Sequence, residues 1–407
     1  MMRVPRSLLS SILLIALLLG FSVVPGLSPA VKVYMLTAGA LCGLSAYLPL
    51  MAGQLSLASP AFYLIGGYAT GMVSVLWVKE DFDTGYWTLP LGFTKITFTS
   101  ELYPWQMVVV ELILGAVAAA AFGFVVGTIA LRLQGIYLAL VTIGAVEILR
   151  ILVLQDQIGP FKGPLDPGDP EGIRHLGPFG GATGLPGQLR TEGMPQPVDF
   201  EWQYLLIAMA LVIVCAFFVF RLERGRTGRA LAAIREDELA ASAMGIRPKY
   251  YKVLAFVLSA VFASFAGTIY AHAQNAWSYR QATFALATAM LAGAVVGGTR
   301  TFLGPIVGGM VITGLFEALR SLAGVDGLPG GLRDILLNIS PIVQGLIMTV
   351  VCVFLSKGLI SAGLVDRLFP RDTTRFRPGP DVIALSAGAI ALSTGPLPTD
   401  ATPEGMR

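Results

Sequence analysis

Charged residues are scarce in this sequence. Asp, Glu, Lys and Arg make up 13% of the 407 residues, whereas 55% are hydrophobic, and the mean hydropathy is +0.73. A soluble globular domain carries about 25% charged residues, so this composition excludes an ordinary soluble fold and indicates a polytopic membrane protein. The formal net charge of +3 gives no support for nucleic-acid binding, because the placement of Lys and Arg matters more than their sum.

Histidine and cysteine are too few and too scattered to form a metal site. The 2 histidines are His175 and His272, which leaves almost nothing for a histidine-based metal centre or a catalytic triad. The 3 cysteines, Cys42, Cys215 and Cys352, lie far apart in apolar runs and lack CxxC spacing. We interpret them as packing residues.

Motifs for nucleotide binding and catalysis are also absent. The chain contains no GxxxxGK[ST] phosphate loop, no HExxH and no GxSxG sequence. If a nucleotide drives this protein, it therefore binds to another chain. We expect no cofactor, and an enzyme, including an intramembrane enzyme, is disfavoured.

Long apolar segments fill most of the chain and predict an all-α integral membrane bundle of about ten spans. The segments are 1–30, 31–50, 57–78, 107–131, 136–155, 202–221, 252–272, 284–299, 302–320 and 340–356. The first could instead be a cleaved signal peptide, because basic residues, an apolar run and small residues follow one another there. Residues 31–360 are predicted to form the permeation domain, and 361–407 a polar, loosely ordered tail.

The stretch 221–252 is the longest charged run between two spans, and it fixes the predicted topology. Its basic residues are Arg221, Arg224, Arg226, Arg229, Arg235, Arg247, Lys249 and Lys252. A short loop rich in Lys and Arg is retained on the cytoplasmic side. The loops 79–106 and 156–201 then lie outside and both termini inside. The second loop is acidic, and it either receives a soluble partner or serves as a tether.

The middle of this loop is predicted to be a helix, with Thr227 capping its first turn and Gly245 and Pro248 ending its last. Its weakly apolar side comprises Ala230, Ile234, Ala240, Ala241 and Met244. Such a helix either docks to a soluble partner or is a solvated connector lying on anionic lipid.

The spans also contain an irregular stretch and a few ionisable residues. Residues 49–60, PLMAGQLSLASP, place Gly53, polar side chains and two prolines where hydrocarbon favours unbroken helix. This break either lines a translocation path or kinks a packing helix. Glu147 and Arg150 are spaced i, i+3 and can neutralise each other, which near the end of a span is mostly structural. The glycines near residues 66–71 and 293–309 favour close helix packing.

Three blocks of sequence together resemble a known family, the permease subunits of ABC importers for branched-chain amino acids, specifically the longer of the two paired permeases. The blocks are GQLSL at 53–57, RLQGIYLALVT at 132–142 with EILR at 147–150 and GGATGL at 180–185, and GRALAAIREDELAASAMGI at 228–246. Ala58 and Ser59 stand where the family commonly has a Gly-His pair.

The resemblance implies that 228–246 is a coupling helix that enters a groove on a cytosolic ATPase. It also implies two ATPase subunits, a second permease, and an extracytoplasmic solute-binding protein, all at a bacterial inner membrane. The residues expected at the ATPase contact are Gly228, Arg229, Ile234, Arg235, Glu236, Asp237, Glu238, Met244 and Gly245. Those expected along the path are Gln54, Ser56, Ser59 and Thr183.

Other functions stay open on the sequence alone. Importers of urea and short amides share this architecture, so the solute is not fixed by the motifs. A secondary carrier or channel would need no second chain, although the spans lack the ladder of deep carboxylates that is typical of a proton-coupled carrier.

Overall fold

A computed structural model describes residues 29–79, 86–91, 94–99, 104–133, 135–155, 200–274, 277–299, 301–323 and 346. The chain divides into two units, Met1–Ala362 and Gly363–Arg407, and every described residue belongs to the first. The expected first span up to residue 28, the span at 340–356, the acidic loop at 156–199 and the tail lie outside the described residues.

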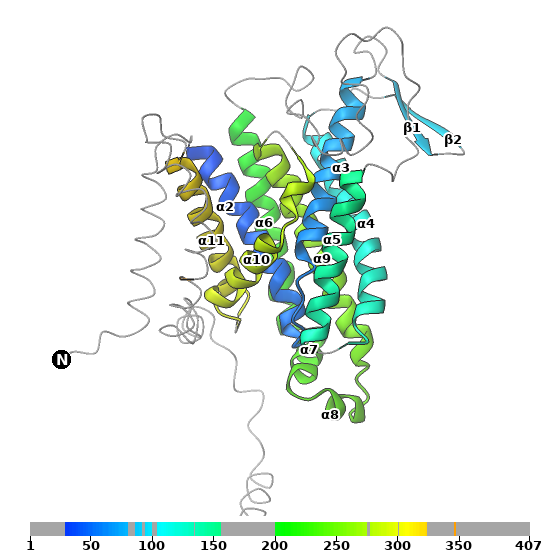
Figure 1. The fold of residues 1–407 in the computed structure, drawn as a ribbon, viewed down its shortest axis with the longest axis vertical. Helices are drawn as coiled ribbons and strands as arrows, with labels where there is room; N and C mark the ends of the chain where they lie inside the picture. The colour runs from blue at the N-terminus through cyan, green and yellow to red at the C-terminus, as the bar shows by residue number, and fades with distance from the viewer. Residues whose placement is uncertain are drawn as a thin grey trace, which may run out of the picture. The chain divides into compact units, whose positions relative to one another are not determined.

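Long helices account for most of the described chain (Figure 1), and each coincides with a predicted apolar segment. They are α2 (Pro29–Met51), α3 (Ser59–Lys79), α4 (Pro104–Ala130), α5 (Ile136–Gln155), α6 (Phe200–Arg224), α9 (Pro248–Gln274), α10 (Phe284–Gly297) and α11 (Leu303–Ala323). A helix satisfies its own backbone polar groups, which hydrocarbon requires. Within the described residues, 4 helices are long and apolar enough to cross a membrane, and three apolar ones are shorter. The count of ten spans therefore stays a prediction.

One segment departs from the all-α expectation. Strands β1 (Tyr86–Leu91) and β2 (Thr94–Thr99) form an antiparallel hairpin inside the predicted loop 79–106, with Tyr86 opposite Thr99 and Leu91 opposite Thr94. The two strands are rich in Thr, aromatic and β-branched residues, which favour a pleated sheet over a helix. The prediction of an all-α fold missed this hairpin, because its strand-forming residues occupy only two short segments of the chain.

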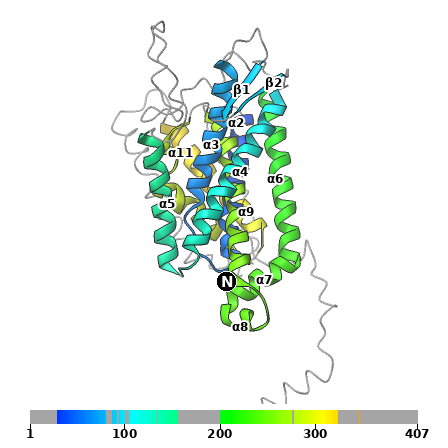
Figure 2. The same cartoon turned by 90° about the vertical axis from the view of Figure 1, so that its right-hand side faces the viewer.

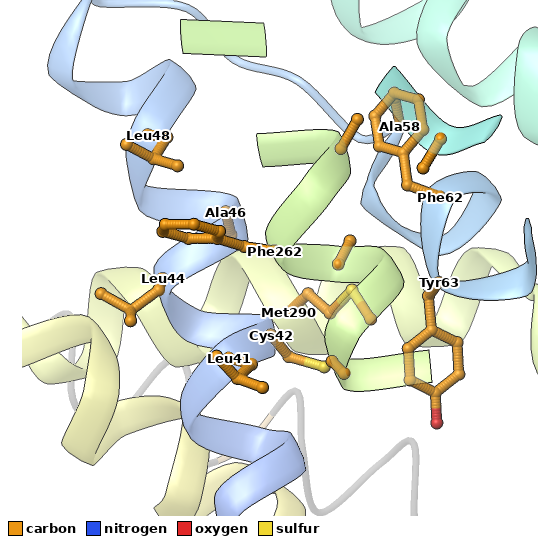
Figure 3. Close-up of a cluster of buried hydrophobic side chains, with 14 of the residues drawn as sticks. Leu41, Cys42, Leu44, Ala46, Leu48, Ala58, Phe62, Tyr63, Phe262 and Met290 are labelled. Carbon is orange, nitrogen blue, oxygen red and sulfur yellow. The ribbon is translucent and has the colours of Figure 1, made fainter. Parts of the chain in front are cut away.

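Helix α9 packs against α2, α3 and α4, and the core gathers around these contacts. Figure 3 shows Leu41 and Leu44 of α2, Phe62 of α3, Phe262 of α9 and Met290 of α10 in one buried cluster. The rings of Phe62 and Phe256 meet edge to face with centroids 5.5 Å apart. Edge-to-face contacts add to the stabilisation that burial alone provides.

Glycine lets several of these backbones touch. A Cβ on Gly267 of α9 would lie 2.0 Å from the carbonyl oxygen of Tyr63 on α3, and one on Gly66 would lie 2.1 Å from that of Ser264. Between α10 and α11, a Cβ on Gly297 would lie 1.8 Å from the carbonyl oxygen of Gly304. The prediction of close packing is confirmed at Gly66, Gly297 and Gly304, since no larger residue fits there without moving a backbone; Gly267 was not predicted.

Candidate functional site

Residues 225–247 connect α6 to α9, and we call them the α6–α9 connector. The connector contains α7 (Arg226–Glu236) and α8 (Glu238–Ala243); Figures 1 and 2 show the two helices together at one end of the bundle. The expectation of one continuous helix was wrong, because the backbone leaves the helical conformation at Asp237 (φ −156°, ψ 114°). The connector is thus two short helices with a joint.

Asp237 makes this joint by capping α8. Its Oδ1 accepts hydrogen bonds from the backbone N–H groups of Leu239 (2.8 Å) and Ala240 (3.0 Å). A side-chain cap of this kind contributes about 1 kcal/mol to a helix end. The predicted cap Thr227 was wrong, because Thr227 lies inside α7 and Gly225 occupies the N-cap position without a side-chain hydrogen bond.

The end of α8 agrees with the prediction for Gly245. Gly245 has φ +81°, and the N–H groups of Gly245 and Ile246 donate to the carbonyl oxygens of Ser242 (3.0 Å) and Ala241 (3.1 Å). These two bonds form a Schellman motif, which glycine favours because it has no Cβ to clash at positive φ. The start of α8 is also tied to α9, since Lys252 Nζ lies 2.6 Å from Glu238 Oε2.

The residues expected at an ATPase contact divide into two groups. Gly228 and Ile234 are buried inside this chain, whereas Arg229, Arg235, Glu236, Asp237, Met244 and Gly245 are exposed, and Glu238 is half-buried. The connector also exposes Leu239, which is 83% accessible, next to Met244 at 82%. Sequence analysis did not single out Leu239, because a continuous helix through Asp237 would have given it a different direction.

Helix α7 also approaches the connection between α2 and α3, residues 52–58, which we call the α2–α3 connector, through the exposed residue Arg235. Gly53 adopts φ +72°, and a Cβ placed on it would lie 3.4 Å from both Cα and Cγ of Arg235. The backbone of the α2–α3 connector therefore lies directly against α7. A movement of α7 must displace either Gly53 or Arg235.

The α2–α3 connector turns back between the helices instead of leaving them. Ser59, the first residue of α3, places its Oγ 3.0 Å from Oγ of Ser45, and Ser45 Oγ lies 3.2 Å from Oγ of Ser259 on α9. Ser45 precedes the end of α2 by six residues, or about 9 Å at 1.5 Å per residue. Helix α3 consequently begins deep beside α2, which agrees with the predicted break in the membrane-embedded part.

Polar groups of the α2–α3 connector are buried there. Leu57 N–H donates to Thr142 Oγ1 on α5 (3.1 Å), and Ala58 N–H lies 3.3 Å from Ser56 Oγ. Gln54 is 4% exposed, and among the described residues neither its Oε1 nor its Nε2 has a hydrogen-bond partner. An unsatisfied buried amide costs about 1–3 kcal/mol, so this position is suited to a state in which Gln54 finds a partner.

The structure thus brings Gln54 and Ser56 together in the α2–α3 connector, places Ser59 at the adjoining start of α3, and sets Gly53 of the connector against Arg235. Thr183, the fourth residue expected along the path, lies outside the described residues. Gly53 and Thr142 belong to the same contacts and were not assigned there from the sequence. The positive φ of Gly53 had a signal in the sequence, a glycine between a proline-containing helix end and a serine-rich turn.

Comparison with known proteins agrees with this arrangement. The chain is 32% identical over 311 residues to the "High-affinity branched-chain amino acid transport system permease protein LivM" of Escherichia coli (strain K12), and 33% identical to the protein of the same name from Salmonella typhimurium. Each match covers 73% of this chain and 64% of the relative, so the chain spans less than two thirds of their length.

A weaker match is the "Probable ABC transporter permease protein YphD" of Escherichia coli, 28% identical over 159 residues, which are 35% of this chain and 48% of that protein. No solved structure matches the chain. Residues 32–352 match the family described as "Branched-chain amino acid transport system / permease component". The chain is therefore a multi-pass membrane protein of the branched-chain amino acid permease family.

Proposed function

We propose that this chain is a permease subunit of an ATP-driven importer that carries branched-chain amino acids or similar small polar solutes. Of two separate ATPase subunits, one binds the α6–α9 connector; a second permease completes the path, and an extracytoplasmic binding protein delivers the solute. The protein resides in a bacterial inner membrane with both termini in the cytoplasm. Residues 31–360 form the transport domain.

The observation that carries this proposal is the contact between Arg235 and Gly53. The α6–α9 connector is continuous with two long apolar helices and exposes Leu239 and Met244, a pattern typical of a docking surface. Its Arg235 lies against Gly53 of the connector that holds Gln54 and Ser56. A partner that binds α8 therefore acts on the α2–α3 connector through one layer of side chains.

In the mechanism that follows, ATP closes the ATPase dimer and displaces α7 and α8. Arg235 moves against Gly53, and the α2–α3 connector responds by exchanging the hydrogen bonds around Ser45, Ser59 and Ser259. Packed helices switch between discrete arrangements and do not deform continuously, so this exchange opens the path to one side at a time. Gly228 and Ile234 keep α7 seated while the exposed residues contact the ATPase.

Reconstitution tests this proposal. The chain is placed in proteoliposomes with its companion permease, ATPases and binding protein, and uptake of labelled leucine is measured with valine and urea as competitors. We expect uptake to require ATP and to be inhibited by valine. Inhibition by urea alone would assign the solute to the short amides, and uptake by the isolated chain without nucleotide would contradict the proposal.

Substitutions in α8 test the docking surface separately. Leu239→Asp removes an exposed apolar side chain while adding an acidic residue to the first turn of α8, where acids stabilise a helix. Combined with Glu236→Lys, it should abolish ATPase binding with the fold intact. The matched control is Lys249→Met, at an exposed position of α9 outside the connector, which should keep binding. Unchanged uptake by the Leu239→Asp, Glu236→Lys chain would refute docking at this surface.

A further inference from the structure

Helix α5 carries an ion pair at a position where a membrane helix rarely carries charge. Glu147 lies beside the midpoint of Ile136–Gln155, about 12 Å of helix from the nearer end. The predicted pairing of Glu147 with Arg150 is confirmed, Arg150 lies about 7.5 Å of helix from the end of α5, and the structural role of the pair stays a prediction. An ionisable residue this deep in a bilayer faces protein or water and marks a solute or ion pathway by default.

The ion pair is only half enclosed by this chain. Arg150 Nη1 lies 2.9 Å from Glu147 Oε2, and the two side chains are 33% and 37% exposed. They sit at the edge of the helix face that packs on the bundle, which includes the buried Val146 and Val153. Ile148, on the other side of Glu147, is 61% exposed. The pair thus lies at the boundary between the bundle and the outer face of α5.

Both charged groups retain unused hydrogen-bonding capacity within the described residues. A guanidinium has five N–H donors, and the bond to Glu147 uses one of them. Arg150 Nε is buried and has no hydrogen-bond partner there. The guanidinium carbon lies 5.5 Å from the ring centroid of Tyr279, in the short helix η3 (Tyr279–Gln281), and this contact fixes its position from one side.

An apolar group lies beside the pair, toward the start of α5. Leu57, Ala139 and Ala287 are buried together, with Ile143 and Leu291 packed against them. Ile143 precedes Glu147 by four residues, so the two share one face of the helix. Three elements meet here: α5, the α2–α3 connector through Leu57, and the first turns of α10 through Ala287.

We propose that this face of α5 is a subsite for a zwitterionic amino acid on its way through the transporter, an inference that rests on the proposed function for the solute class. Arg150 receives the α-carboxylate, Glu147 receives the α-ammonium group, and the apolar group around Ile143 accommodates the aliphatic side chain. Without solute the two charges neutralise each other. With solute one internal ion pair is exchanged for two, so no net charge is left at membrane depth in either state.

The test uses the complete reconstituted transporter with saturating binding protein. Glu147→Gln and Arg150→Gln should each lower leucine uptake about tenfold or more, the effect of losing one charge-assisted hydrogen bond. Assembly and ATP hydrolysis should be retained. The matched control Ile148→Gln adds the same amide beside the pair and should leave uptake within about twofold of the unmodified transporter.

The reversed pair, Glu147→Arg with Arg150→Glu, separates a subsite from a structural ion pair. It keeps opposite charges on the same helix face but exchanges their places relative to Tyr279 and Ile143. Uptake should remain low, whereas restored uptake would show that the pair is structural and would overturn the subsite. If the unmodified transporter fails to take up leucine with ATP, the proposed function fails. If it succeeds and both glutamine variants match it, only the subsite fails.

Thiol labelling gives a second measurement that keeps both charges. Ile143→Cys and Ile148→Cys are compared in a chain whose three cysteines are replaced by alanine. A small charged methanethiosulfonate reagent should modify position 143 faster, and saturating leucine with binding protein should slow that reaction. Equal rates at the two positions, or no protection by leucine, would contradict a solute-filled face.

Discussion

Helices α9 and α5 are both membrane-length and apolar, yet they relate to the rest of the chain in opposite ways. Helix α9 is much more enclosed than α5. Within the most apolar part of Pro248–His272 in α9, 61% is buried inside the chain, against 28% for Ile136–Gln155 of α5. Helix α9 is surrounded by α2, α3 and α4, whereas α5 leaves Ile136, Leu140 and Ile148 exposed. One helix is a scaffold, and the other forms a surface.

The polar residues of the two helices also differ in where their partners lie. On α9, Ser259 is hydrogen-bonded to Ser45, and His272 Nε2 lies 2.6 Å from Oε2 of the fully buried Glu111 on α4. On α5, Glu147 and Arg150 mainly face each other at the edge of the bundle. The comparison teaches that a polar residue in an apolar helix indicates structure when its partners belong to neighbouring helices, and a pathway when it stands at an open boundary.

The largest effect on the scaffold should come from His272→Leu, which removes one partner of Glu111. Glu111 has no solvent exposure, and breaking a buried pair from one side destabilises a fold by about 3–5 kcal/mol. We expect a large fall in the thermal unfolding temperature of the purified chain in detergent. The corresponding removal on α5, Arg150→Gln, should cost less, because the Glu147 side chain is 37% exposed whereas Glu111 is fully buried.

The double variant Glu111→Leu, His272→Leu provides the control. It removes both polar groups together, and replacing a buried pair by apolar residues is often nearly neutral. Much of the lost stability should therefore return. A double variant as unstable as His272→Leu alone would mean that the site depends on shape rather than on the pairing of polar groups.

A somewhat smaller effect is expected from a glycine of α9. Gly267→Leu places a Cβ 2.0 Å from the carbonyl oxygen of Tyr63, and overpacking of this kind costs about 1–3 kcal/mol. The matched control on α5 is Gly144→Leu, since a Cβ there meets nothing within 4 Å. Thermal unfolding of the isolated chain should fall for the first variant and stay unchanged or rise for the second, because leucine favours a helix over glycine. Equal changes in the unfolding temperature of the two variants would contradict the conclusion that α9 is a packed scaffold and α5 a surface.

Sequence analysis located the helices of both kinds because apolar runs of this length leave few alternatives. It also placed the end of α8 at Gly245, where a specific backbone conformation demands glycine. It missed the joint at Asp237, since Glu236, Asp237 and Glu238 interrupt the helix without glycine or proline. A cap is worth only about 1 kcal/mol, and tertiary contacts decide whether a chain uses it.

The same joint explains why the predicted apolar side of the α6–α9 connector was only partly correct. Ala230, Ile234 and Ala241 are buried as one continuous helix would suggest, but Met244 is 82% exposed. The Glu147–Arg150 pairing was found from its i, i+3 spacing, which is a local property. The contact of Arg150 with Tyr279 was missed, because it joins residues far apart in the sequence. Such information resides in the packing of distant segments.

The smallest effect is expected where the scaffold meets the α6–α9 connector. Lys252 on α9 pairs with Glu238, whose side chain is 33% exposed, so Lys252→Met should lower stability by about 1 kcal/mol or less. The control Lys249→Met, at an exposed position one turn earlier, should change nothing. The difference between the two variants should shrink only in part at 1 M salt, because the Debye length there is about 3 Å and the Lys252 side chain, 2.6 Å from Glu238, is mostly buried.

Lys252→Met should nevertheless alter coupling, because the ion pair ties the first turn of α8 to α9 and Asp237 interrupts the helix between α7 and α8. With this tie removed, an ATPase bound at Leu239 can move α8 without moving α9. We expect ATP hydrolysis to persist while the amount of leucine transported per ATP falls. An unchanged ratio, measured in the same proteoliposomes, would show that force reaches the scaffold through α7 and the Arg235–Gly53 contact alone.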